Sequence, residues 1–102
     1  MLSISSINSG SNGNCYYVGN DKEAILVDAG ISCREIERRM KRQGLDMLKV
    51  KAVFVSHEHS DHIRGIPTLA KKHKLPIYIT SSTQLHGGLR LNEAIPFRAY
   101  DP

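Results

Sequence analysis

The sequence contains little cysteine: only Cys15 and Cys33 occur among its 102 residues. A secreted domain of this size that depends on disulfides usually carries more cysteines, in an even framework. Two cysteines would allow one disulfide, but two reduced thiols are the simpler interpretation, because disulfides are rare in the cytosol. We therefore expect a cytoplasmic protein without a disulfide scaffold.

Long hydrophobic runs are also missing. No apolar stretch approaches the roughly 20 residues needed to cross a membrane, and residues 1–6 lack the basic and apolar regions of a signal peptide. The chain shows no repeat or low-complexity tract, and its 40% hydrophobic and 24% charged residues are ordinary for a soluble globular protein. We therefore expect no membrane partner and no more than one domain.

The formal net charge of +4 is modest, and its distribution says more than its size. Basic residues crowd residues 34–42 and residues 71–74. Mild positive charge favours anionic partners. The alternative, for either cluster, is a helix face that is simply exposed to solvent.

Turn-forming residues divide the chain into short segments. Apolar or alternating runs predict strands at about residues 2–7, 15–18, 24–27, 51–56 and 76–80. The wholly apolar run at 24–27 predicts a strand buried on both faces. With helices between them, the order is strand, strand, strand, helix, strand, helix, strand, helix. It predicts an α/β fold with a mixed sheet and helices packed on it.

Three helices are expected. Ser32 and Glu35 have the spacing of a capping box, followed by a helical stripe of Cys33, Ile36 and Met40, and Gly44 is a typical helix end. A second, short amphipathic helix is expected to start near Pro67, with apolar positions at Ile66, Leu69 and Ala70 and with His73 one turn on. A third is expected to begin at about residues 82–85.

The densest chemical signal is residues 57–62, with the sequence HEHSDH directly after a strand. Ligands at the carboxyl end of a buried strand face the crevice where α/β proteins bind ligands. In extended backbone His57 and His59 point the same way. A turn then brings Asp61 and His62 to a neighbouring point. One segment can thus hold two adjacent metals with two ligands each.

Imidazole and carboxylate suit zinc, manganese, iron or cobalt. A metal with an open position lowers the pKa of its bound water to about 7, and two metals about 3.5–4 Å apart can clamp the attacking and leaving oxygens of a hydrolysis. We therefore expect a hydrolytic two-metal site. The H-E-x-x-H zincin motif fails, because position 61 is aspartate. A catalytic triad using Ser60 lacks a nucleophile elbow, and a merely exposed polar loop would crowd many titratable groups without a metal.

The HEHSDH segment resembles the H-x-H-x-D-H signature of the metallo-β-lactamase fold superfamily. Residues 26–30 (LVDAG) look like its first motif, an aspartate that ends a strand. Residues 9–14, 31–36 and 80–83 resemble the YycJ-like (WalJ-like) branch of bacterial proteins, which is related to phosphodiesterases and nucleases. The resemblance covers nearly the whole chain and implies the N-terminal half of an αββα sandwich.

The resemblance implies roles for five residues. His57 and His59 would bind the first metal, and Asp61 and His62 the second, with Asp61 also orienting the attacking water as a catalytic residue. Asp28 would support the site by hydrogen bonds from behind the ligands.

Other positions refine this picture. Glu58 and Ser60 occupy variable positions of the motif. In the diiron oxidoreductases of the same fold a glutamate stands where His59 stands here, so His59 favours a hydrolase.

The family's remaining ligands lie in the second half of its fold. Here only His73 and His86 remain, and we expect both to be structural, with His73 on a helix face. We therefore expect residues 1–102 to be the N-terminal part of a single domain. Without its partner sheet, an apolar sheet face would be exposed, which would also allow association with a second copy.

The resulting hypothesis is a metal-dependent phosphodiesterase, a 5′-to-3′ exonuclease on DNA that uses two divalent ions, zinc or manganese. Arg34, Arg38, Lys71 and Lys72 would contact phosphates, whose neutralisation drives affinity. One alternative is a hydrolase of a small thioester, lactam or phosphodiester. Another is a non-catalytic fragment. The 102 residues alone are expected to be inactive.

Overall fold

The computed structural model describes residues 2–10, 13–56, 63–79 and 97–99. Its centre is a six-stranded sheet in which the strands lie in chain order from β1 to β6. The first three strands are antiparallel and β3 to β6 are parallel, so the sheet is mixed as predicted. The strands are β1 (Ser3–Asn8), β2 (Cys15–Gly19), β3 (Ala24–Val27), β4 (Val50–Phe54), β5 (Ile77–Ile79) and β6 (Phe97–Ala99).

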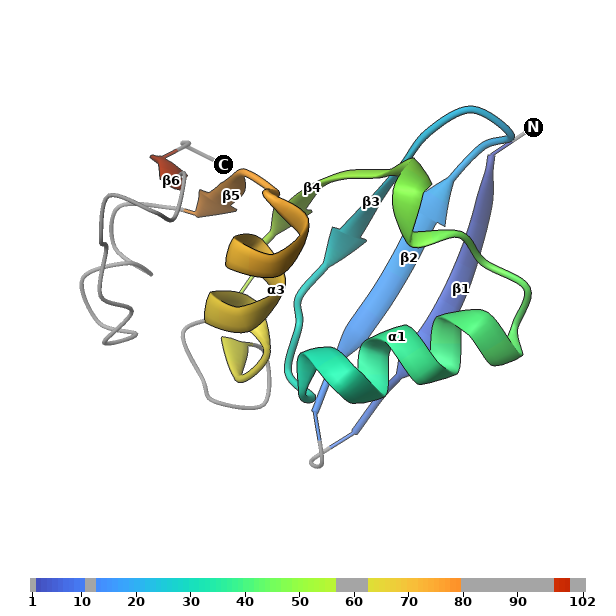
Figure 1. The fold of residues 1–102 in the computed structure, drawn as a ribbon, viewed down its shortest axis with the longest axis horizontal. Helices are drawn as coiled ribbons and strands as arrows, with labels where there is room; N and C mark the ends of the chain where they lie inside the picture. Colours follow the sequence, from blue (N-terminus) through green and yellow to red (C-terminus); the bar gives the residue numbers. More distant parts are fainter. Residues whose placement is uncertain (1, 11–12, 57–62, 80–96, 100–102) are drawn as a thin grey trace.

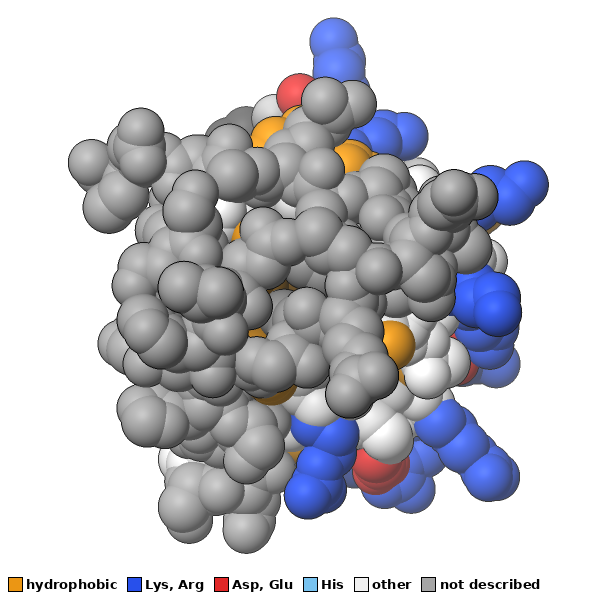
Figure 2. Space-filling model, turned by 90° about the vertical axis from the view of Figure 1, so that its left-hand side faces the viewer, with side chains coloured by type: hydrophobic (Ala, Val, Ile, Leu, Met, Phe, Trp, Pro, Cys, Tyr) orange, Lys and Arg blue, Asp and Glu red, His pale blue; other side chains and the backbone are white. Residues whose placement is uncertain are grey.

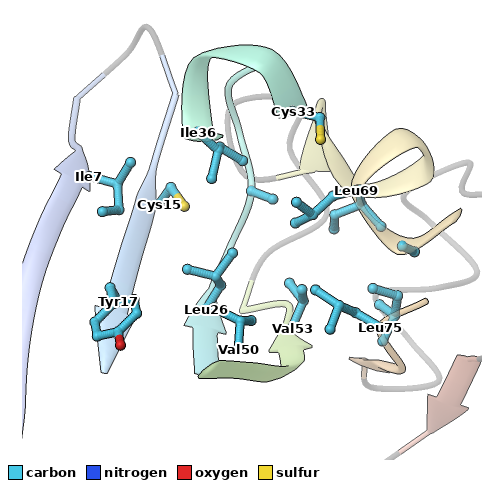
Figure 3. Close-up of a cluster of buried hydrophobic side chains, with 14 of the residues drawn as sticks. Ile7, Cys15, Tyr17, Leu26, Cys33, Ile36, Val50, Val53, Leu69 and Leu75 are labelled. Carbon is cyan, nitrogen blue, oxygen red and sulfur yellow. The ribbon is translucent and has the colours of Figure 1, made fainter. Parts of the chain in front are cut away.

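Two helices cover one side of this sheet. Helix α1 (Cys33–Arg42) connects β3 to β4 together with a short 3₁₀ turn, η1 (Met47–Lys49), and α3 (Ile66–His73) lies between β4 and β5. Both helices lie in front of the sheet in Figure 1. Buried side chains from both helices and from β1 to β5 form one hydrophobic cluster. Figure 3 shows Ile36 and Leu69 pointing from the helices toward Leu26 and Val53 of the sheet.

Helix α1 forms where the sequence predicts it. The Ser32 hydroxyl accepts a hydrogen bond from the Glu35 backbone N–H at 3.2 Å, which caps the first turn. The predicted stripe of Cys33, Ile36 and Met40 is buried. Gly44 has φ +75°, a left-handed conformation that glycine adopts without steric cost, and the helix ends just before it.

Helix α3 begins one residue before Pro67, close to its predicted start. Pro67 lacks an N–H but loses nothing in the first turn, where that group has no partner within the helix. Ile66, Leu69 and Ala70 are buried, as predicted, and the left-handed Lys74 (φ 55°) ends the helix.

The two faces of the sheet differ in burial. Leu26, Val53 and Ile77 point under the helices and are fully buried. On the other face Ile4 is 70% exposed, while Phe54 and Tyr78 are half-buried and stack at a ring distance of 4.7 Å. The prediction that residues 24–27 are buried on both faces was wrong, because Ile25 and Val27 are only half-buried.

Some expectations differ from the structure or fall outside it. The strand β6 and the turn η1 were not predicted. The helix expected at residues 82–85 lies outside the described residues. No helix within the described ranges has the length and apolar character needed to span a membrane. Cys15 and Cys33 are both buried and are not joined by a disulfide.

Candidate metal centre at the carboxyl ends of β3 and β4

The predicted ligands His57, His59, Asp61 and His62 lie outside the described residues, as do Glu58 and Ser60. The residues on either side of this segment are described. Strand β4 ends at Phe54 and leads through Val55 to Ser56, and the chain is described again from Ile63 into α3. The segment therefore follows the carboxyl end of a strand, the position that the sequence predicts.

Asp28 lies beside the entry to this segment. Its carboxylate accepts hydrogen bonds from the Ser56 backbone N–H at 2.7 Å and from the Ser56 hydroxyl at 2.5 Å. The Asp28 N–H donates to the Phe54 carbonyl at 2.7 Å, which extends the pairing of β3 and β4 by one step. Asp28 is only 3% exposed and has φ +65°, a conformation that aspartate tolerates better than most residues. Asp28 thus fixes the backbone immediately before His57.

The loop that carries Asp28, residues 28–31, also holds the exit of the segment. The Gly65 N–H donates to the Ala29 carbonyl at 2.7 Å. A Cβ atom on Gly65 would lie 2.2 Å from the Ile31 carbonyl oxygen, so only glycine allows this approach. Both flanks of residues 57–62, at Ser56 and at Gly65, are therefore bonded to the same short loop.

The opposite side of this loop contacts the turn between β1 and β2. The Gly30 N–H donates to the Asn14 carbonyl at 2.9 Å. A Cβ atom on Gly13, whose φ is +131°, would lie 2.6 Å from the Gly30 carbonyl oxygen. The glycine-rich turn thus supports the 28–31 loop by close backbone contact.

Asp28 and its neighbour Cys15 are both buried. Burial raises the pKa of the nearby Cys15 thiol to about 12, and the negative charge of Asp28 contributes to the rise. Cys15 therefore stays a neutral thiol and is not a candidate nucleophile. A carboxylate in such a setting acts strongly on the donors that it faces, because the local dielectric constant is low.

The two histidines outside the motif have different outcomes. His73 lies at the end of α3, is half-buried, and its Nε2 is 2.7 Å from the Glu37 carboxylate of α1, which confirms the predicted helix-packing role. His86 lies outside the described residues.

The four basic residues predicted to contact nucleic acid are all exposed. Arg38 donates to Glu35 at 2.5 Å, and Lys72 pairs with Glu37 at 2.8 Å. Arg34 lies in the first turn of α1, close to the 28–31 loop, and Lys71 in the last turn of α3. Figure 2 shows lysine and arginine side chains at the top, right-hand and lower edges of the view.

A pocket of about 320 Å³ lies at the other ends of the strands. Residues that line it include Asn20, Glu23 and Lys51, at the amino ends of β3 and β4. Ligands at residues 57–62 follow the carboxyl ends, so this pocket is separate from the candidate centre.

Comparison with known families gives a clear assignment. The sequence profile described as "Metallo-beta-lactamase superfamily" matches residues 8–98 of the chain. The chain belongs to the metallo-beta-lactamase superfamily. A relative within it, "Exodeoxyribonuclease YycJ" of Bacillus anthracis, is 45% identical over 82 residues, 80% of this chain and 31% of its own length. "Exodeoxyribonuclease WalJ" of Streptococcus pneumoniae (strain D39) is 37% identical over 75 residues, 74% of this chain and 28% of its own length.

A solved structure shows the same superfamily fold. The "metallo-beta-lactamase fold protein YhfI" from Bacillus subtilis aligns with 99% of this chain and 46% of its own, with a TM-score of 0.70 and 23% identity. The predicted fold and the predicted resemblance to YycJ and WalJ proteins are thereby confirmed. The chain spans about a third of the length of these curated relatives.

Sequence reasoning found Asp28 but missed the residues that hold its loop. Ser56, Gly65 and Gly13 were not singled out as site residues. Their signals are weak in a sequence: a serine after a buried strand and single glycines without a fingerprint spacing. Their roles depend on contacts between segments far apart in the chain.

Proposed function

We propose that this chain carries the first part of a two-metal phosphodiesterase site, and that the protein it belongs to is a 5′-to-3′ exonuclease acting on DNA. His57 and His59 would bind one divalent ion, and Asp61 and His62 a second. The observation that carries the proposal is that both flanks of this segment are hydrogen-bonded to one loop. Ser56 before it and Gly65 after it each donate a hydrogen bond to the 28–31 loop. The two exodeoxyribonuclease relatives favour DNA as the substrate.

In this proposal Asp28 is a positioning residue, which holds the backbone just before His57. Its carboxylate holds the Ser56 N–H and hydroxyl, so the backbone that enters His57 is fixed before any metal binds. Preorganised ligands lose less conformational entropy on binding than mobile ones. Loss of such outer support typically costs metal sites about 10–100-fold in affinity or activity.

The donor set fits divalent zinc or manganese, because neutral imidazole and carboxylate are their usual ligands. Two such ions, when bound, would supply hydroxide at neutral pH and stabilise both oxygens of an in-line displacement. Asp61 would accept a hydrogen bond from the attacking water and so set its direction. Arg34, near the 28–31 loop, and Lys71 would contact the phosphate backbone of the substrate.

The extent of the chain matters for this function. Because the relatives are about three times as long as the matched region, we propose that residues 1–102 form the N-terminal part of one domain. Further ligands would come from the remainder of that domain. We call a protein that carries these residues at the relatives' length the domain-length protein, and place it in the cytoplasm.

The test is a nuclease assay on the domain-length protein with Mn²⁺ or Zn²⁺. We expect stepwise release of nucleotides from 3′-labelled DNA that leaves the label to the last, as 5′-to-3′ degradation requires. His57→Ala should lower the rate by more than about 100-fold, because a ligand matters more than its outer support. Hydrolysis of a small thioester or lactam without DNA degradation would overturn the substrate assignment.

Glu58→Gln is the matched control. It lies between two proposed ligands but at a variable position of the motif, so it should retain nuclease activity. If His57→Ala were as active as Glu58→Gln, the metal mechanism would be wrong. Elemental analysis of the purified 102-residue chain and of its His57→Ala variant addresses the non-catalytic alternative, since stoichiometric metal that is lost in the variant would contradict it.

A further inference from the structure

A second group of metal-ligand side chains lies where the helices α1 and α3 meet. One ligand atom each of Cys33, Glu37 and His73 lies within 4.8 Å of the other two. Cys33 and Glu37 are four residues apart on α1 and so share one face of that helix, and His73 is the last residue of α3. Figure 3 shows the Cys33 side chain on the side of α1 next to α3. All three belong to helices that the structure describes in full.

This cluster uses none of the residues proposed for the candidate centre after β4. The segment 57–62 precedes α3, while His73 is seven residues beyond the helix start at Ile66, or about 10 Å along the axis. The HEHSDH segment also contains no cysteine. A sulfur ligand therefore distinguishes the helix cluster from the centre proposed above.

Without a metal, the cluster is an ion-pair network. The Glu37 carboxylate lies 2.7 Å from His73 Nε2 and 2.8 Å from Lys72 Nζ. The side chains of Glu37 and His73 are 27% and 23% exposed, and that of Lys72 is 57% exposed. Burial raises the pKa of the Cys33 thiol, and the Glu37 carboxylate raises it further while Lys72 lowers it. The ion pairs explain the positions of Glu37, Lys72 and His73. Cys33 packs in the core, and its sulfur lies within 4.8 Å of ligand atoms of Glu37 and His73.

We propose that Cys33, Glu37 and His73 bind one Zn²⁺ ion, with a water molecule as the fourth ligand. Thiolate, imidazole and carboxylate together are a donor set that zinc accepts and that magnesium and calcium do not. Tetrahedral zinc places such ligand atoms about 3.4–3.7 Å apart. The Glu37 and His73 atoms, now 2.7 Å apart, would have to open to this spacing, while the distances to the Cys33 sulfur, which are at most 4.8 Å, would have to close to it. Both changes are within reach of side-chain adjustment.

Charge and protons balance in this site. The thiol gives its proton to solvent as the sulfur–metal bond forms, and His73 binds as neutral imidazole through Nε2. One thiolate and one carboxylate then neutralise the two positive charges of the ion. Lys72 leaves Glu37 and turns to solvent, which its exposed position allows. The bound ion would join the first turns of α1 to the last turn of α3 and so fix the helix layer on the sheet.

The test is a titration of the 102-residue chain with Co²⁺, which replaces zinc and shows a near-ultraviolet charge-transfer band only when a thiolate is bound. We expect the band to saturate at one Co²⁺ per chain and to disappear when Zn²⁺ is added. Cys33→Ser should abolish it. Cys15→Ser is the matched control and should keep it, because Cys15 lies in the core beside Asp28.

Two further variants separate the metal site from the ion pair. Glu37→Gln should weaken binding by at least about 10-fold. Lys72→Met should tighten it, because the competing ammonium is gone, whereas a purely structural ion pair would gain nothing from its loss. His57→Ala should leave the band unchanged, which keeps the test independent of the proposed nuclease site.

Two results would overturn the proposed zinc site. A chain that is folded by circular dichroism yet shows no thiolate band overturns the proposal, as does a band that survives Cys33→Ser. The same titration of the domain-length protein, compared with its Cys33→Ser variant, decides the matter if the shorter chain does not fold.

Discussion

Asp28 and Glu37 are both carboxylates that join two segments of the chain, but they do so in different surroundings. Asp28 is 3% exposed and accepts hydrogen bonds from the backbone N–H and the hydroxyl of Ser56. The Glu37 side chain is 27% exposed and faces the side chains of Lys72 and His73. The first joins the ends of β3 and β4, and the second joins α1 to α3.

The comparison shows that the contribution of a carboxylate to the free energy of unfolding depends on how far it is buried. The Asp28 carboxylate is buried, and a hydrogen bond to a charged group contributes about 1.5–3 kcal/mol. A partly exposed ion pair exchanges its partner for water and typically contributes below about 1 kcal/mol. We therefore expect changes near Asp28 to affect stability and site geometry together, and changes at Glu37 to affect stability little.

The largest effect is expected for Asp28→Ala. It removes the acceptor of two hydrogen bonds and places alanine at a positive φ, so the free energy of unfolding should fall by about 3 kcal/mol. Urea unfolding measures this change. Asp28→Asn is the control, because asparagine keeps an acceptor oxygen and tolerates this backbone; it should recover most of the stability while metal affinity at residues 57–62 stays about 10-fold or more reduced. Equal stability of Asp28→Ala and the unmodified chain would remove the distinction between the two carboxylates.

The second largest effect is expected for Gly65→Ala, which should lower the free energy of unfolding by about 2 kcal/mol. The added Cβ would meet the Ile31 carbonyl oxygen at 2.2 Å, so the backbone of the 28–31 loop or of α3 must shift. Thr68→Ala, an exposed substitution on the same helix, should change the unfolding free energy by less than about 0.5 kcal/mol. Similar stability losses in the two variants would contradict the close contact.

Stability at alkaline pH tests the buried surroundings of Asp28, because the neighbouring Cys15 thiol titrates there. Its pKa is raised from 9.0 to about 12 in the folded chain, so its contribution to stability is present below about pH 9 and is lost as the pH rises toward 12. Between pH 9 and 10 the loss from this group should be about 1 kcal/mol. The loss should be smaller in Cys15→Ala, measured by unfolding across this pH range. An unchanged slope in that variant would show that Cys15 titrates normally.

Stability at acid pH tests the ion pairs of Glu37, and this change in the free energy of unfolding should be the smallest. Lys72 and His73 lower the pKa of Glu37 below 4.5, so its contribution is present above that value and is lost as the pH falls through the lower, folded value. Because Glu37 is partly exposed, the loss should stay below about 1 kcal/mol. Metal-free Glu37→Gln should lack this acid-sensitive part of the stability curve. A loss as large as that of Asp28→Ala would show that exposure does not separate the two carboxylates.

Helix α1 and the loop at Asp28 show how far the sequence alone could lead. The cap at Ser32, the stripe of Cys33, Ile36 and Met40, and the end at Gly44 are local signals, and all appear in the structure. Local periodicity did not show that residues 24–27 have one half-buried face, because that depends on which elements cover the sheet. The short strand β6 carries too few residues for any periodic signal.

The sequence by itself determined the order of the strands and helices from β1 to β5, the family resemblance and the placement of HEHSDH after a strand. Each of these depends on residues that are neighbours in the chain. Only the tertiary structure decided that Ser56 and Gly65 are bonded to one loop, and that Cys33, Glu37 and His73 meet between two helices. Those contacts join residues 28 to 40 positions apart. Hydrogen-bond partners at such separations are chosen by the packing of the sheet and helices, which no local pattern specifies.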